Sequence, residues 1–102
     1  MGLIRGTTPT HTFKLPFDTA IVQSAAVLYA QDDVVVLVKE AKDCAMQGNE
    51  ISVTLTQEDT LLFDCHAKAQ IQIRVLTTDG QALASDIRIV RVGKCLSNEV
   101  LS

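Results

Sequence analysis

Two histidines and three cysteines are the side chains of this chain best suited to nucleophilic or metal chemistry near neutral pH. Cys65 and His66 are neighbours in the sequence. A thiol nucleophile needs a base within hydrogen-bond reach, yet neighbouring residues on an extended strand point to opposite faces. We therefore interpret His66 as a turn residue after a buried thiol. The sequence predicts no catalytic residue and no enzyme activity.

The same side chains are numerous enough to bind a zinc ion: His11, Cys44, Cys65, His66 and Cys95. Structural zinc sites usually contain paired ligands about two to four residues apart. No Cys-x-x-Cys or His-x-x-x-His pair occurs in this chain. The spacing predicts no metal and no cofactor, with a site assembled from distant strands as the alternative. Because the cysteine count is odd, we expect reduced thiols, and a single disulfide with one spare thiol is the alternative.

Acidic pairs could in principle provide general acid and base catalysis. Asp32-Asp33 and Glu58-Asp59 both lie where the apolar pattern breaks. Catalytic carboxylates must face each other across a cleft, which consecutive loop residues do not do unaided. We interpret both pairs as solvated turn residues.

The charge balance excludes several kinds of partner. A net charge of -3 and a pI near 5.2 give no attraction for polyanions, so nucleic-acid binding is not predicted. Arg74, Arg88 and Arg91 alternate with apolar residues and are expected on solvent faces, where pairing of their strands could gather a small basic patch. The longest apolar run, 34–38, is far too short to span a membrane, and the N-terminus lacks a secretory pattern. We expect a soluble protein made without a signal peptide.

Alternation of apolar and polar residues predicts the elements that position these side chains. We expect about seven short strands with turns between them, over 11–15, the second half of 21–30, 34–38, 43–47, 50–55, 69–77 and 81–92. Thr56 with Asp59 predicts the cap of a short helical crossover. In the last strand the apolar phase slips between Ile89 and Val90, which predicts a bulge.

This pattern predicts an all-β, immunoglobulin-like β-sandwich with one short helical crossover, and a small closed barrel is the alternative. The expected organisation is an N-terminal arm over 1–8, the sandwich domain over 9–93 and a C-terminal tail over 94–102. Aromatic residues are few and β-branched residues abundant, so the core should be aliphatic.

One strand is apolar at every position, and it is the candidate interaction edge: Val34, Val35, Val36, Leu37 and Val38. Such a strand is either central, with both faces covered, or it presents a face or an edge to a partner. Both alternatives are consistent with the sequence.

Four segments together carry a resemblance to a known group of proteins: Arg5 to Phe13 with Leu15 to Asp18, Leu55 to Thr60, Ile71 to Thr77, and Ala84 to Ile87. They resemble small, mostly uncharacterised proteins encoded in the structural-gene modules of tailed phages and prophages of Firmicutes. The chain is more loosely similar to the immunoglobulin-like N-terminal domain of phage baseplate upper proteins, which is an attachment module.

The resemblance implies a non-enzymatic, virion-associated structural or adaptor protein of the baseplate, tail or head. Its implied partners are other phage structural proteins, with a homo-oligomer also possible. Its implied location is the virion, or the host cytoplasm during assembly. The alternative function is a carbohydrate- or protein-binding surface module.

Overall fold

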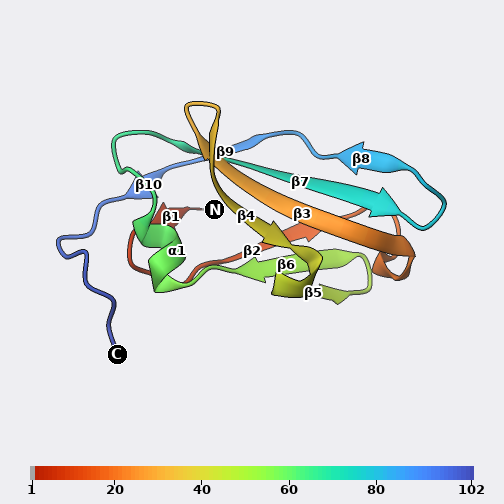
Figure 1. Cartoon of the computed structure of the whole chain (residues 1–102), viewed down its shortest axis with the longest axis horizontal. Helices are drawn as coiled ribbons and strands as arrows, with labels where there is room; N and C mark the ends of the chain where they lie inside the picture. The colour runs from red at the N-terminus through yellow and green to blue at the C-terminus, as the bar shows by residue number, and fades with distance from the viewer. Residues whose placement is uncertain (1) are drawn as a thin grey trace.

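Alternating burial along the strands builds two facing sheets in the computed structural model, which describes residues 2–102 (Figure 1). The strands are β1 (Leu3–Ile4), β2 (Thr10–Lys14), β3 (Val22–Gln31), β4 (Val34–Glu40), β5 (Cys44–Gln47), β6 (Glu50–Thr54), β7 (Ala69–Thr77), β8 (Ala82–Ala84), β9 (Arg88–Val90) and β10 (Val92–Gly93). The helices are α1 (Gln57–Leu61) and two short 3-10 turns, η1 (Thr19–Ile21) and η2 (Ala41–Asp43). No described helix is long and apolar enough to cross a membrane.

The two sheets differ in size. The smaller sheet has the order β2-β6-β5, and the larger has the order β4-β3-β7-β8, with β9 also pairing with β7. Strands within both sheets are antiparallel, whereas β1 and β10 form a separate parallel pair. Helix α1 lies at the end of the sandwich where the C-terminal segment also runs (Figure 1).

The core lies between the inward faces of the two sheets. It is mainly aliphatic, as expected, but its centre is the fully buried ring of Tyr29. The Phe63 ring meets the Tyr29 ring edge-on at a centroid distance of 5.9 Å, which is a favourable aromatic geometry. Strands β2, β3, β6 and β7 each direct alternate side chains into this core.

Two predicted turns are confirmed. Asp32 and Asp33 connect β3 to β4 with φ angles of 50° and 63°, a conformation that Asp tolerates better than most residues. The Gln70 side chain fixes this turn because it accepts from the Asp33 amide at 2.9 Å and donates to the Asp33 carboxylate at 2.8 Å. Gly48 and Asn49 form the two-residue connection from β5 to β6.

The predicted helix cap is also present. The Thr56 hydroxyl accepts from the Asp59 amide at 3.1 Å, and the Asp59 carboxylate accepts from the Thr56 amide at 2.9 Å. Asp59 also pairs with Lys39 of β4 at 2.8 Å. Burial alone would raise the pKa of Asp59, but hydrogen bonds from Lys39 and Thr56 outweigh it and hold the pKa below its usual value. The pair of Glu58 and Asp59 therefore caps a helix and connects it to β4.

The last predicted strand, over 81–92, is wrong in two respects. It is divided into β8, β9 and β10. The ladder with β7 ends at Ser85, whose amide still donates to the Ile73 carbonyl but whose hydroxyl, rather than its carbonyl, accepts from the Ile73 amide. The bulge expected between Ile89 and Val90 is absent, since burial continues to alternate through Val90 and Val92. Successive apolar residues occur there because both faces of the strand carry them.

The remaining differences are at the element boundaries. Strand β3 occupies all of Val22–Gln31 rather than the second half of 21–30. Within the predicted arm over 1–8, β1 pairs with β10 and Leu3 is buried in the core, while Met1 lies outside the described residues. The tail over 94–102 forms no strand, but Gln57 exchanges two hydrogen bonds with the backbone of Leu101.

Candidate interaction surface

His11 is part of the core and is not available as a base or an exposed ligand. Its ring is buried, with Nδ1 at 2.7 Å from the Tyr29 hydroxyl and Nε2 at 3.4 Å from the Gly2 carbonyl. A neutral ring satisfies both contacts when Nε2 donates to Gly2 and Nδ1 accepts from Tyr29. Burial lowers the pKa of His11 and raises that of Tyr29, so both groups stay uncharged near neutral pH.

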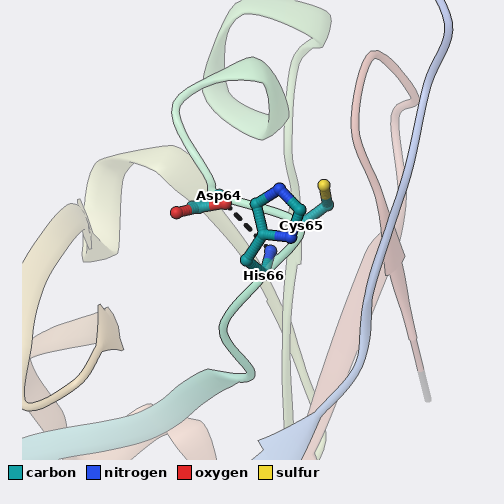
Figure 2. Close-up of side chains that lie close together, drawn as sticks. All are labelled: Asp64, Cys65 and His66. Carbon is teal, nitrogen blue, oxygen red and sulfur yellow. Dashed lines mark hydrogen bonds between the residues drawn. The ribbon is translucent and has the colours of Figure 1, made fainter.

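Cys65 and His66 lie in the loop between α1 and β7, where the expected turn is present, although Cys65 is only partly buried. With Asp64 they bring one carboxylate, one thiol and one imidazole atom to within 4.8 Å of one another (Figure 2). An Asp64 oxygen already accepts from the His66 amide at 2.9 Å. Built metal sites orient each imidazole ligand with a second hydrogen bond, and no hydrogen bond to the His66 ring is present among residues 2–102. This loop is therefore not assigned as a metal centre.

The three cysteines are free and lie apart from a shared site. Cys44 donates through its thiol to the Glu40 carbonyl at 3.3 Å, and burial with the nearby Asp43 raises its pKa. Cys95 lies beside Gly6, near the β1 and β10 pair. Of the five residues considered as zinc ligands, His11 is buried in the core and Cys44 packs against it, Cys65 and His66 lie in the loop after α1, and Cys95 follows β10.

The basic patch that strand pairing could have gathered does not form. Arg74 is exposed on the outer face of the larger sheet, but Arg88 is the partner of the buried Ile71 and so lies on the inner side. Its guanidinium carbon is 4.9 Å from the centre of the Phe13 ring. Arg88 and Arg74 consequently point to opposite sides of the same sheet.

The candidate interaction edge is an edge strand. Strand β4 pairs with β3 on one side and ends the larger sheet on the other. A bulge between Tyr29 and Ala30 gives β4 one extra residue, and Val34, Val35 and Val38 are about half exposed or more, at 66%, 53% and 46%. Val36 and Leu37 instead pack partly against the core. The predicted block therefore divides into exposed and partly buried residues.

Two further residues extend the exposed group across the sheet. The register aligns Leu28 with Val38 and Ala30 with Val35 on one side, and Ile89 with Gln70 on the other. Ile87 and Ile89 are 53% and 63% exposed. Together these apolar residues form the outer apolar face of the larger sheet: Leu28, Val35, Val38, Ile87 and Ile89. A shallow hollow of about 160 Å³ lies in it between β3, β4 and β7.

Sequence reasoning found the β4 part of this face and missed the part after β8. The sequence does contain this information. Ile87 and Ile89 lie on one face of an extended strand, and Val90 and Val92 lie on the other. In the sequence alone, that change of face predicts a bulge rather than a strand with apolar residues on both faces. Only the pairing of β9 with β7 places Ile89 on the same face as the outward residues of β3 and β4, with Gln70 of β7 between them.

The architecture agrees with solved immunoglobulin-like domains. The chain is similar to the immunoglobulin-like domain of mouse leukocyte-associated immunoglobulin-like receptor 1, with a TM-score of 0.52, 11% identity, and coverage of 90% of this chain and 85% of that chain. It also matches the V domain of amphioxus IgVJ-C2, with a TM-score of 0.38, 10% identity, and coverage of 91% and 99%. No protein-family model and no curated protein matches the chain.

The predicted fold class is therefore confirmed. The chain is an all-β, immunoglobulin-like sandwich with one short α-helix. At 11% identity the likeness shows the fold alone, and function must be argued from the surfaces of this chain.

Proposed function

We propose that this protein is a non-enzymatic protein–protein interaction module that serves as a structural or adaptor part of a tailed phage or prophage particle. The observation that carries the proposal is the outer apolar face together with the free edge of β4. Exposed apolar surface and unpaired strand edges are costly to leave open, so proteins generally cover them with a partner. The resemblance of four chain segments to phage structural-module proteins supplies the class of partner.

A second copy of this chain is among the partners that the proposal includes. The mouse domain of similar fold was described as a strand-swapped dimer. Light scattering on the purified protein measures its mass directly. A dimer that dissociates when Val35 is replaced by Lys would assign the outer apolar face to self-association.

The test of the particle role is incorporation into virions. Tagged copies carrying Val35→Lys or Ile89→Lys should be excluded from particles, because either lysine would be buried against the partner without a counter-charge. The matched control is Leu62→Lys. Leu62 is 59% exposed and lies next to α1, away from this face. Mass spectrometry of purified particles measures the tag. Detection of neither the wild-type chain nor the control in particles would contradict the proposal.

The alternative is a carbohydrate- or protein-binding surface module. Lectin-like sites usually present aromatic rings to solvent, whereas Phe13, Tyr29 and Phe63 are buried and Phe17 is partly buried. A glycan array on which the wild-type protein binds a defined sugar would favour this alternative over the particle role.

A further inference from the structure

A second open feature lies on the side of the sandwich where β2 faces β8. A groove of about 300 Å³ runs between these strands, lined by Phe13, Lys14, Leu15, Pro16, Phe17, Ile73, Val75, Leu83, Ala84, Ser85 and Arg88. It is separate from the outer apolar face, since its floor is formed by the inward side chains Ile73 and Val75 of β7. Small-molecule pockets are roughly 300 to 1,000 Å³, so this volume suits a few side chains rather than a large cofactor.

The groove is open because the smaller sheet ends at β2 and leaves β8 exposed. Leu83 is the pairing partner of the buried Val75 and therefore lies on the inward side of the sheet. Even so, 42% of Leu83 is exposed, whereas Val75 is 5% exposed. An apolar residue that faces inward and stays exposed to solvent indicates a site that another apolar side chain can fill.

The edge of β2 offers free backbone groups beside this apolar floor. Leu15 donates its amide to Asn49 and Pro9 accepts from Leu55, so the odd-numbered residues of β2 face the β6 hairpin. In an antiparallel pair the intervening residues direct their backbone groups the other way. The N–H and C=O groups of Thr12 and Lys14 therefore point to the free edge, where an extended segment can pair with them.

The charged groups at the groove are all positive. Lys14 borders it, Arg88 lies across Phe13 at one end, and the lining contains no carboxylate. Neither cation forms an ion pair among the described residues, although Glu50 is the cross-strand neighbour of Lys14. This local excess of positive charge occurs on a chain whose net charge is -3.

We propose that the groove between β2 and β8 is a second binding site, which takes an extended segment of a partner protein that alternates apolar and acidic side chains. The segment adds to the edge of β2 through its backbone. Its inward apolar side chains cover Leu83 and Val75, its outward carboxylates pair with Lys14, and Arg88 at the end of the groove adds to the positive potential that attracts them. Charge complementarity with the groove is the reason for assigning an acidic segment as its occupant. The site does not depend on the outer apolar face.

Two synthetic peptides test the site directly. Both have eight residues with blocked ends, and one alternates valine with glutamate while the other alternates valine with lysine. Titration of isotope-labelled protein by NMR should show that the glutamate peptide shifts the amides of Thr12 and Lys14. We expect its affinity to exceed that of the lysine peptide by about five-fold for each cation engaged, the size typical of exposed charge pairs.

Variants separate the charge of the groove from its packing. Arg88→Met keeps an apolar stem over Phe13 and should reduce the preference for the glutamate peptide, and Lys14→Glu should reverse the preference in favour of the lysine peptide. The matched control is Arg91→Met, because Arg91 is exposed and does not line the groove. A far-ultraviolet circular dichroism spectrum equal to that of the wild type checks folding of each variant.

Several outcomes would overturn the proposal. These are equal affinity for the two peptides, absence of binding by either, and shifts centred on β4 rather than on β2. If the amides of Thr12 and Lys14 shift with protein concentration in the absence of peptide, the occupant of the site is a second copy of the chain and not an acidic segment. Particle incorporation that fails while the glutamate peptide still binds would reject the proposed function and leave this site standing.

Discussion

His11 is a candidate base or metal ligand in the sequence, but in the structure it is a core residue that contacts Tyr29. Alternation along the first long strand places His11 on the same face as Phe13, and the structure buries both rings. The partner of His11 comes from β3, which local pattern does not reveal. Its chemistry as a base or ligand is therefore replaced by a structural role, in which a neutral imidazole satisfies a buried hydroxyl.

This role predicts a pH dependence of stability. Burial holds the pKa of His11 below its ordinary value of 6.5, so the unfolded chain binds a proton that the folded chain refuses. The contribution of His11 is complete above about pH 6.5 and is lost as the pH falls from there through the folded pKa. We expect the melting temperature to decrease over this interval in a thermal series followed by circular dichroism.

The variant His11→Gln should remove that part of the pH dependence while lowering stability at every pH. His66→Gln is the matched control, because it removes the exposed histidine and should keep the dependence that His11 confers. An unchanged pH dependence in His11→Gln would contradict the assignment.

At the scale of elements, the contact between β1 and β10 is unusually close. A Cβ atom added to Gly93 would lie 2.8 Å from Cγ1 of Ile4. We expect Gly93→Ala to destabilise the fold by about 2 kcal/mol, since overpacking forces the two strands apart. Denaturant unfolding measures the loss.

A double-mutant cycle checks the cause. Ile4 is 54% exposed, so Ile4→Ala alone should have a small effect, and combined with Gly93→Ala it should recover much of the stability. Strictly additive losses would contradict a steric origin.

The cap of α1 gives a second prediction at this scale. Thr56→Ala removes the hydroxyl that accepts from the Asp59 amide and should cost about 1 kcal/mol in the free energy of unfolding. Thr56→Ser keeps the hydroxyl and is the matched control. Equal stability of the two variants in urea unfolding would contradict the capping role.

Elements whose signals are local were predicted well. The turn at Asp32 and Asp33, the Thr56 cap and the strand over 69–77 each depend on residues close in sequence. The predictions that failed depend on distant partners. The ladder of the last strand ends at Ser85, whose hydroxyl accepts from the Ile73 amide, and β1 is a strand only because β10 lies beside it. For the same reason the groove between β2 and β8 had no signature in the sequence.

The whole molecule is a sandwich whose two sheets are held together without a cross-link among the described residues, because its three cysteines are free. Its stability must then come from burial between the sheets. We expect the same melting temperature with and without a reducing agent. A lower melting temperature in the reducing agent would reveal a disulfide and contradict this arrangement.

The outer apolar face and the groove between β2 and β8 lie in different parts of the larger sheet and can be occupied together. One is an open surface with Ile89 and Val35 at its sides, and the other is a channel over Val75. A chain of this size with two independent surfaces can connect two neighbours, which is the property that an adaptor needs. Single-surface variants therefore separate the two connections.

The buried contact between Tyr29 and His11 also makes the chain its own optical probe. Tyr29 is its one tyrosine, and the sequence contains no tryptophan. Tyrosine emission and the tyrosine band of the near-ultraviolet circular dichroism spectrum therefore report on a single ring at the centre of the sandwich, next to the imidazole of His11. Protonation of the core and loss of its packing can both be followed without any attached label.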